Sequence, residues 1–405
     1  NAGSYSVTVT NANGCSATSA ATNVTVNAKP TPTITAGGPT TFCTGGSVTL
    51  TASSGSSYLW STGATTQSIS VSNAGSYSVT VTNANGCSAT SAATNVTVNA
   101  LPTPTITAGG PTTFCTGGSV TLTASTGSSY LWSNGATTQA ITVSTGGSYS
   151  VTVTNANGCS ATSAATAVTV NAKPTPTITA GGPTTFCTGG SVTLTASSGS
   201  SYLWSTGATT QSISANAAGG YSVTVTNASG CSATSAATNV TVNALPAVPA
   251  ITAGGPTTFC AGGSVTLTAP AGFTYLWSNG ATTQSIAASA SGSYSVTVTN
   301  ANGCSRTSAA TAVTVNAATS ITQQPASATI PRNTTATVSV TATGTGTLTY
   351  QWYSGTSGTT TNPISGATSA SYTTPRLGKG TYRYWVRVTG SCGVVNSNAA
   401  TITVP

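Results

Sequence analysis

The fold is decided by a stretch that opens with Cys43-Thr44-Gly45-Gly46-Ser47-Val48-Thr49-Leu50-Thr51, passes through Tyr58-Leu59-Trp60 and closes on Gly75-Ser76-Tyr77-Ser78-Val79. The same landmarks return three more times along the chain. The first cysteines of the four copies are 72, 72 and 73 residues apart, at Cys43, Cys115, Cys187 and Cys260. A period this long and this regular indicates a tandem array of small domains rather than one large core.

Each copy alternates apolar and polar residues with the two-residue period of a β-strand. Ser78-Val79-Thr80-Val81-Thr82 places two valines on one face and Ser or Thr on the other. Turn-forming pairs such as Thr62-Gly63 and Asn85-Gly86 separate the short apolar runs. About seven short strands per copy predict an all-β domain that closes as a two-sheet sandwich.

Two aromatic residues in each copy match fixed positions of the immunoglobulin fold. Trp60 lies where that fold buries the tryptophan of strand C, and Tyr77 lies where it places the tyrosine corner that opens strand F. The usual inter-sheet disulfide is replaced by an apolar contact, because its two positions hold Ala52 and Val79. We expect these aromatic pairs to form the domain cores: Trp60, Tyr77, Trp132, Tyr149, Trp204, Tyr221, Trp277, Tyr294, Trp352 and Tyr382.

The copies are joined by short linkers with alternate prolines, such as Ala100-Leu101-Pro102-Thr103-Pro104. Such linkers favour extended polyproline geometry, so we expect the array of immunoglobulin-like sandwiches to form an extended rod. From about Ala318 the sequence changes, and Tyr350-Gln351-Trp352-Tyr353 becomes the new strand C. The predicted domains are a partial repeat with only the last strands at residues 1–28, four complete repeats at 29–100, 101–172, 173–244 and 245–317, and a divergent basic immunoglobulin-like domain at 318–405.

The ten cysteines predict disulfides made in an oxidising compartment. Eight of them recur as pairs that are 44 residues apart, one pair per complete repeat: Cys43, Cys87, Cys115, Cys159, Cys187, Cys231, Cys260 and Cys304. Two pairings fit this spacing. Cys43 can bond Cys87 within its repeat, or it can reach Cys159 of the next repeat. We favour the first pairing because each repeat carries its own pair, which leaves Cys15 and Cys392 unpaired in this chain.

The composition excludes several kinds of chemistry. The chain has no Asp, no Glu and no His. General acid–base catalysis usually depends on these side chains, and neither a Ser-His-Asp triad nor a pair of catalytic carboxylates can be built. Calcium binding needs carboxylate oxygens, which are also missing. We therefore expect neither an enzyme nor a bound metal or cofactor.

The eight basic residues, which give a formal net charge of +8, are unevenly placed. Five of them lie in the last domain: Arg332, Arg376, Lys379, Arg383 and Arg387. Nucleic-acid binding usually requires a denser basic stripe, so we do not expect it. Arginine beside Tyr or Trp is typical of interfaces, which makes candidate interface residues of Arg376, Arg383, Trp385 and Arg387. No run approaches ~18 apolar residues, so no segment is expected to span a membrane.

The residues Pro39-Thr40-Thr41-Phe42-Cys43-Thr44-Gly45-Gly46, with Tyr58-Leu59-Trp60-Ser61 and Asn83-Ala84-Asn85-Gly86-Cys87, resemble the immunoglobulin-like repeats of very large surface proteins of Bacteroidota. The last domain resembles a bacterial module found in the same kind of protein. The resemblance implies export to the cell surface, through the type IX secretion route, in an adhesin or gliding-motility filament. No type IX sorting domain is recognisable, so we expect an internal or truncated segment.

From the repeats and this resemblance we expect an extracellular stalk or filament segment. It would present a binding tip, or build a fibre with neighbouring copies or other surface proteins. The alternative is a recognition module that binds glycans or a protein through the last domain.

Overall fold

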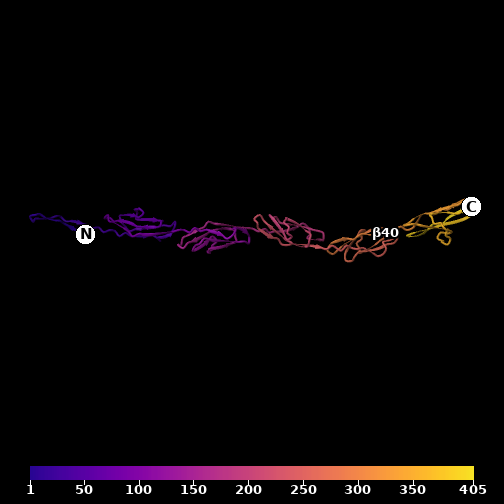
Figure 1. Cartoon of the computed structure of the whole chain (residues 1–405), viewed down its shortest axis with the longest axis horizontal. Coiled ribbons are helices and arrows are strands. Elements are labelled where there is room, and N and C mark those ends of the chain that lie inside the picture. The colour runs from indigo at the N-terminus through magenta and orange to yellow at the C-terminus, as the bar shows by residue number, and fades with distance from the viewer. The chain divides into compact units, whose positions relative to one another are not determined.

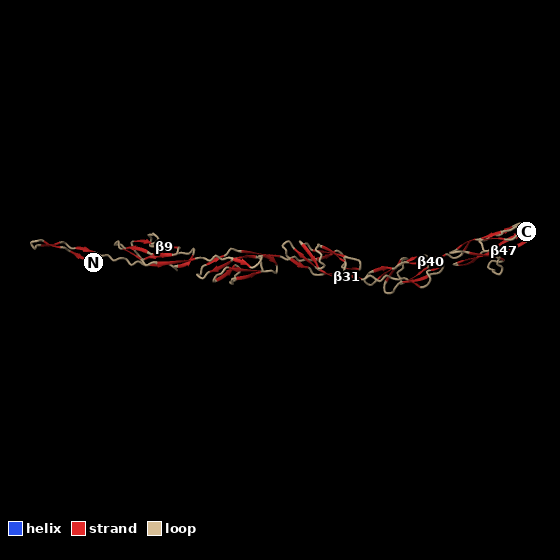
Figure 2. Ribbon diagram, viewed as in Figure 1, coloured by secondary structure: helices blue, strands red, loops and turns tan.

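The computed structural model describes residues 1–405, and it consists of β-strands and turns with no helix (Figure 2). It therefore contains no helix that is long and apolar enough to cross a membrane. Two compact units make up the chain. Figure 1 shows the path of the backbone, coloured by residue number from the N-terminus to the C-terminus. The first comprises Asn1–Thr175, Gly199–Ser201 and Thr224–Thr234, and the second comprises Pro176–Ser198, Tyr202–Val223 and Ser235–Pro405. The predicted all-β class is confirmed.

The first complete repeat is a two-layer sandwich of short strands. They are β5 Ile34–Ala36, β6 Thr41–Cys43, β7 Val48–Ala52, β8 Ser57–Trp60, β9 Ser68–Val71, β10 Gly75–Tyr77, β11 Val79–Thr82, β12 Ser88–Thr90 and β13 Thr94–Asn99. One layer has the order β5-β7-β9, and the other consists of β8-β11-β12 and β10-β13-β6. All of these pairs are antiparallel except β6 with β13, which run parallel with Cys43 opposite Asn99.

The core of this repeat lies between the two layers, where the alternating apolar residues of the strands meet. Leu50 and Val81 are fully buried there, and Ala52 and Val79 belong to the same cluster in place of a disulfide. The buried Trp60 donates its Nε1–H to the carbonyl of Thr66 at 2.8 Å. The Tyr77 hydroxyl donates to the carbonyl of Asn73 at 2.8 Å, which is the hydrogen bond of a tyrosine corner.

The second complete repeat has the same strand sequence and sheet orders. Its strands are β14 Ile106–Ala108, β15 Thr113–Cys115, β16 Val120–Ala124, β17 Ser129–Trp132, β18 Ala140–Val143, β19 Gly147–Tyr149, β20 Val151–Thr154, β21 Ser160–Thr162 and β22 Thr166–Asn171. Trp132 and Tyr149 are buried in its core.

The third and fourth complete repeats continue the pattern. The third has β23 Ile178–Ala180, β24 Thr185–Cys187, β25 Val192–Ala196, β26 Ser201–Trp204, β27 Ser212–Ala215, β28 Gly219–Tyr221, β29 Val223–Thr226, β30 Ser232–Thr234 and β31 Thr238–Asn243. The fourth has β32 Thr252–Ala253, β33 Thr258–Cys260, β34 Val265–Thr268, β35 Thr274–Trp277, β36 Ser285–Ala288, β37 Gly292–Tyr294, β38 Val296–Thr299, β39 Ser305–Thr307 and β40 Thr311–Asn316. Trp204, Tyr221 and Trp277 are buried, whereas Tyr294 is partly exposed.

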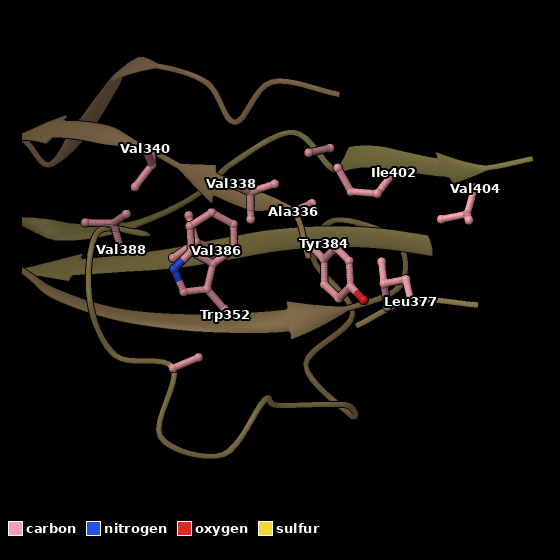
Figure 3. Packing of buried hydrophobic residues seen from close by; sticks show 12 residues of the cluster. Ala336, Val338, Val340, Trp352, Leu377, Tyr384, Val386, Val388, Ile402 and Val404 are labelled. Carbon is pink, nitrogen blue, oxygen red and sulfur yellow. The ribbon is translucent and has the colours of Figure 1, made fainter. Parts of the chain in front are cut away.

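The last domain has a larger core around longer strands. Its strands are β41 Ser320–Gln323, β42 Ala328–Thr329, β43 Thr337–Ser339, β44 Thr341–Thr343, β45 Thr349–Ser354, β46 Ser371–Thr373, β47 Gly380–Gly390, β48 Gly393–Asn396 and β49 Ala400–Val404. The main sheet has the order β42-β49-β47-β45, and β48 also pairs with β47. Figure 3 shows Trp352 and Tyr384 gathered with Val338 and Ile402 between the strands. Tyr382 is only partly buried.

Residues 1–28 form two short antiparallel pairs rather than a sandwich. The strands β1 Gly3–Tyr5 and β4 Thr22–Val24 pair with each other, as do β2 Thr8–Thr10 and β3 Ser16–Thr18. Their apolar side chains, which correspond to core residues of the complete repeats, are exposed.

Candidate functional site at the joints between repeats

Eight of the ten cysteines form four disulfides, and each of these joins a cysteine of one predicted domain to a cysteine of the next. They are Cys43–Cys159, Cys115–Cys231, Cys187–Cys304 and Cys260–Cys392, with Cα–Cα distances of 5.7, 5.6, 5.6 and 5.4 Å. The favoured pairing within each repeat is therefore wrong. Cys392, expected to be unpaired, is bonded, and Cys87, expected to be bonded, is free together with Cys15.

The first cysteine of each bonded pair lies at the end of its repeat from which the linker to the next domain leaves. Strand β6 runs parallel to β13, the last strand of the repeat, and places Cys43 beside Asn99. The chain then reverses, since Gly46 donates its N–H to the carbonyl of Cys43 at 2.9 Å and Gly45 has a φ of 93°. A positive φ is easily reached only by glycine, which explains Gly45. At Gly46 the reason is space, since a Cβ there would lie 3.1 Å from the carbonyl oxygen of Cys43. Cys43 thus faces the linker to the next repeat.

The second cysteine of the first three bonded pairs lies in a tight turn that contacts the linker leading into its repeat. In the second repeat, Asn155 accepts hydrogen bonds on its Oδ1 from the N–H groups of Asn157 and Cys159, both at 3.0 Å. The Nδ2 of the same Asn155 donates to the carbonyl of Ala100 in the linker at 2.9 Å. One side chain therefore shapes the turn that presents Cys159 and also binds the linker that this disulfide spans.

The distance between Cys43 and Cys87 along the repeat explains why these two cysteines are not bonded to each other. Cys87 precedes β12 and β13, and Asn99 ends β13, with Cys43 at its side. The intervening ~12 residues of nearly extended chain cover roughly 35–40 Å. Two cysteines can be bonded only when their Cα atoms are within about 7 Å. Cys43 and Cys87 therefore lie at opposite ends of the repeat.

The same arrangement recurs at the later joints. Asn227 donates its Nδ2–H to the carbonyl of Ala172 at 2.8 Å, and Asn300 donates to that of Ala244 at 3.0 Å. The joint to the last domain is built differently, since the Ala317 N–H donates to the Thr345 Oγ1 at 2.8 Å. These asparagines were not singled out from the sequence. The available signal was an Asn that stands four positions before the second cysteine in every repeat.

The candidate interface residues of the last domain are not all available to a partner. Trp385 is fully buried and stacks on Tyr353, with ring centroids 4.5 Å apart and an interplanar angle of 12°. The prediction that Trp385 lies at an exposed interface is therefore wrong. Arg383 is exposed, and Arg387 is partly buried with its Nε 3.2 Å from the Oδ1 of Asn396.

Arg376, the remaining candidate interface residue, precedes β47 and is exposed. Its Nη1 donates to the carbonyl of Asn333 at 2.9 Å. Nowhere do three His, Cys, Asp or Glu side chains come together as a metal site would require.

Residues 318–405 match a family described as a domain of unknown function (DUF8696). No curated protein matches the chain.

Among solved structures, the N-terminal eight Ig domains of Down Syndrome Cell Adhesion Molecule are similar over 100% of this chain, at 14% identity and a TM-score of 0.36. The chain spans only 64% of that structure's length. Immunoglobulin domains 1–4 of Sidekick-1 are similar over 75% of this chain and 99% of that one, at 15% identity and a TM-score of 0.28. A three-Ig structure of titin is similar over 57% and 98% of the two chains, at 11% identity and a TM-score of 0.32. The chain's own strands, sheet orders and tyrosine-corner hydrogen bonds make it an all-β array of immunoglobulin-like domains in tandem.

Proposed function

We propose that the chain is a segment of an extracellular stalk or filament in which a disulfide locks each domain to the next. The observation that carries the proposal is that all four disulfides cross a joint. A disulfide within a domain mainly restricts the unfolded state of that domain. A disulfide across a joint gives the two domains a second covalent connection beside the linker, which suits a chain that transmits force.

The disulfides also shorten the covalent path through the chain. The shortest covalent path from Cys43 crosses the first bridge to Cys159 and follows about 28 residues to Cys187. It then crosses the bridge to Cys304 and follows about 44 residues back along the chain to Cys260. The last bridge joins Cys260 to Cys392. A fully unfolded but oxidised chain could therefore place Cys43 and Cys392 about 250 Å apart at most. The reduced chain, with about 349 residues between them, could place them about 1,200 Å apart.

Single-molecule force spectroscopy of the full chain, held at its two termini, tests this proposal. We expect the fully stretched length between Cys43 and Cys392 to be about 250 Å without reductant and about 1,200 Å with it. Disulfides within repeats would instead leave about 170 residues, or about 600 Å. That intermediate length, or a length that reductant does not change, would contradict the proposal. The variant Cys15→Ser with Cys87→Ser is the matched control and should behave as the parent chain, because neither thiol is bonded.

The sequence resemblance supports a more specific setting, which is the surface of a bacterium of the Bacteroidota. There the segment would belong to an adhesin or gliding-motility filament exported by the type IX route, in an environment where disulfides persist. It would contact neighbouring copies or other surface proteins. Immunogold electron microscopy of intact cells, with an antibody against residues 318–405, should label surface projections. Label that requires opened cells would contradict this location.

A second candidate function is recognition of a glycan or protein by the last domain. It is favoured by the concentration of basic residues there, with Arg376 and Arg383 exposed. A glycan array probed with the full chain, and with the Arg376→Ala and Arg383→Ala double variant, tests it. Binding that the double variant loses would support recognition through this surface. Absence of binding would contradict recognition and leave the structural role as the proposed function.

A further inference from the structure

We propose that the outer face of β47 in the last domain is a binding site for a carboxylate-bearing sugar, and that loop 355–362 covers this site as a lid. The proposal rests on the second candidate function, recognition by the last domain, and gives it a site and a ligand class. Four features of this face carry it: an inserted loop, an enclosed aromatic pair, an unpaired indole N–H, and two arginines without a carboxylate partner.

The loop belongs to an insertion that the complete repeats lack. In the first repeat, the backbone N–H of Trp60 donates to the carbonyl of Ala64, four residues further on. In the last domain, the equivalent Trp352 makes this bond to Ala367, fifteen residues further on. The bonds of the two indole N–H groups give the same difference of eleven residues. The repeats close their sandwiches without this insertion, and surface loops of this kind are where binding residues concentrate.

The inserted residues carry the chain across β47. Strands β45 and β48 lie on opposite sides of β47, since residues 387–389 pair with both of them. On the β45 side, the Gly355 N–H donates to the carbonyl of Arg383 at 2.8 Å. On the β48 side, the Ser357 Oγ donates to the carbonyl of Ser397. Because the core fills the inner face of this sheet, the loop covers the outer face.

Beneath the loop lies an aromatic pair where the repeats have two serines. The strand register makes Tyr353 and Trp385 the equivalents of Ser61 and Ser78. In the first repeat, the Ser78 N–H donates to the Ser61 Oγ at 3.2 Å, and Ser61 is exposed. In the last domain both rings are buried and stacked, but neither belongs to the core cluster. The pair therefore serves the outer face of the sheet rather than the core.

The indole of Trp385 has an unused hydrogen-bond donor. The other five tryptophans of the chain each donate their Nε1–H to a backbone carbonyl at 2.8 or 2.9 Å. The Nε1 of Trp385 is buried and has no partner. A buried donor without an acceptor destabilises the fold that contains it. An oxygen acceptor that a ligand brings beside this ring would remove that cost.

Two arginines flank Trp385 on the same face, because side chains alternate along a strand. Arg383 is exposed, and Arg387 has its Nε 3.2 Å from the amide oxygen of Asn396. The chain has no Asp or Glu, so no side-chain carboxylate of its own can neutralise either guanidinium. A guanidinium binds a carboxylate through two parallel hydrogen bonds. A sugar ring packs its C–H face on an aromatic ring and offers its oxygens to an N–H donor. A carboxylated sugar therefore matches the ring, the donor and the arginines together.

The loop must move before a ligand can reach Trp385, since the ring is fully enclosed. Residues 355–362 are all Gly, Ser, Thr or Asn, so the loop exposes no apolar side chain of its own when it moves. The same composition offers no apolar pocket for the side chains of a peptide. A sugar would replace the loop as the cover of the rings, and its binding would shift the loop toward the open position.

The experiment probes the full chain with a glycan array that carries glucuronate, galacturonate and sialic acid, each beside the same glycan with its carboxyl reduced to an alcohol. We expect at least one carboxylated glycan to bind, and its reduced counterpart to bind at least ~10-fold more weakly. The double variant Tyr353→Ser and Trp385→Ser, which gives this face the serines of the repeats, should also bind at least ~10-fold more weakly. Lys379→Ala is the control, because it removes an exposed positive charge outside β47, and it should stay within ~2-fold of the parent chain.

The outcomes separate this site from recognition by the last domain in general. Binding that survives the double serine variant but is lost in Arg376→Ala would overturn the site and leave recognition standing. Binding of neutral glycans alone would overturn the carboxylated ligand and leave recognition standing. A chain that binds no glycan would overturn both.

A spectroscopic measurement keeps the test decisive if the double serine variant folds poorly. Each of the six indole N–H groups gives one NMR signal, and Trp385→Phe identifies the signal of Trp385 by its loss. Addition of the bound glycan to the parent chain should shift this signal and leave the five hydrogen-bonded indoles unchanged. A glycan that binds without shifting the Trp385 signal would contradict the proposal.

Discussion

The complete repeats and the last domain place their cysteines differently, although both are immunoglobulin-like sandwiches. Each complete repeat has a small core around one tryptophan and carries two cysteines. The last domain buries two tryptophans, has an 11-residue strand β47, and carries only Cys392. That one cysteine is bonded across the joint to Cys260. If the disulfides stabilised single domains, the lone Cys392 of the last domain would have no partner within its domain. The comparison therefore teaches that the cysteines belong to the joints.

The largest effects should come from the cores, and they should be confined to single domains. Trp352→Ala in the last domain and Trp132→Ala in the second repeat each remove a fully enclosed ring, which should cost about 3–5 kcal/mol of that domain's stability. The smaller repeat has less stability to lose. Hydrogen exchange measured domain by domain should show faster exchange only in the altered domain. A loss of protection throughout the chain would show that the cores are not separate.

The disulfide of the last domain offers the sharpest test of the comparison. Cys260→Ser should destabilise residues 318–405 by up to about 4 kcal/mol, although Cys260 lies in the preceding repeat. The reason is that the bridge ties the unfolded last domain to the end of the fourth repeat and restricts its freedom. Urea unfolding followed by hydrogen exchange of residues 318–405 would measure this. Cys87→Ser is the control and should change nothing. An unaltered last domain in Cys260→Ser would contradict the account.

A smaller effect is expected from the asparagine at each joint. Asn155→Ala removes the Oδ1 that accepts two hydrogen bonds in the turn and the Nδ2 that donates one to the linker carbonyl of Ala100, and should cost about 1–2 kcal/mol locally. Asn11→Ala is a matched control, since Asn11 makes the same two turn hydrogen bonds, to Asn13 and Cys15, in the partial repeat. Amide exchange around Ala100 should accelerate only in Asn155→Ala. If both variants left the linker equally protected, the amide would have no role at the joint.

The smallest expected effect is the dependence of the unfolding free energy on pH. At alkaline pH this dependence should be stronger for the last domain than for the repeats. The chain has no Asp, Glu or His side chain, so its unfolding free energy should be nearly flat between about pH 4 and 8. Burial raises the pKa of Tyr372 and Tyr384 above the ordinary value of 10.0, and at Tyr384 the nearby Tyr372 and Tyr382 add to this.

The sign of the alkaline effect follows from those two tyrosines. Above about pH 10 the unfolded chain loses protons that the folded domain retains, so the stability of the last domain should fall as pH rises. Urea titrations of the Cys15→Ser and Cys87→Ser double variant from pH 4 to pH 11 would test both parts. Acid unfolding near pH 4, or a last domain that stays equally stable to pH 11, would contradict this expectation.

The strands, the sandwich class and the positions of Trp60 and Tyr77 could be inferred from the sequence because they follow from local periodicity and turn residues. The disulfide pairing could not, since a cysteine spacing of 44 residues within repeats and one of 116 or 117 between repeats are equally regular. The choice depends on the parallel pairing of β6 with β13, which brings Cys43 to Asn99 across more than fifty residues. The lone Cys392 was the clue, because only pairing between domains gives it a partner within the chain.

The burial of Trp385 also could not be inferred from the sequence. Strand alternation places Trp385 on the face of β47 opposite Tyr384 and Val386, which point into the core. Trp385 was an interface candidate because it stands close to Arg383 and Arg387 in the sequence. Its burial comes from contacts such as the stacked ring of Tyr353 on the neighbouring strand β45, and these depend on the assembled sheet.

The central claim is that disulfides cross the joints, and cutting one linker tests it most directly. A site-specific protease sequence can be inserted between Pro102 and Thr103, in the linker that the Cys43–Cys159 bridge spans. After complete cleavage, a non-reducing gel should still show one covalent species, and reductant should separate it into the two fragments. Two fragments that separate without reductant would contradict the claim.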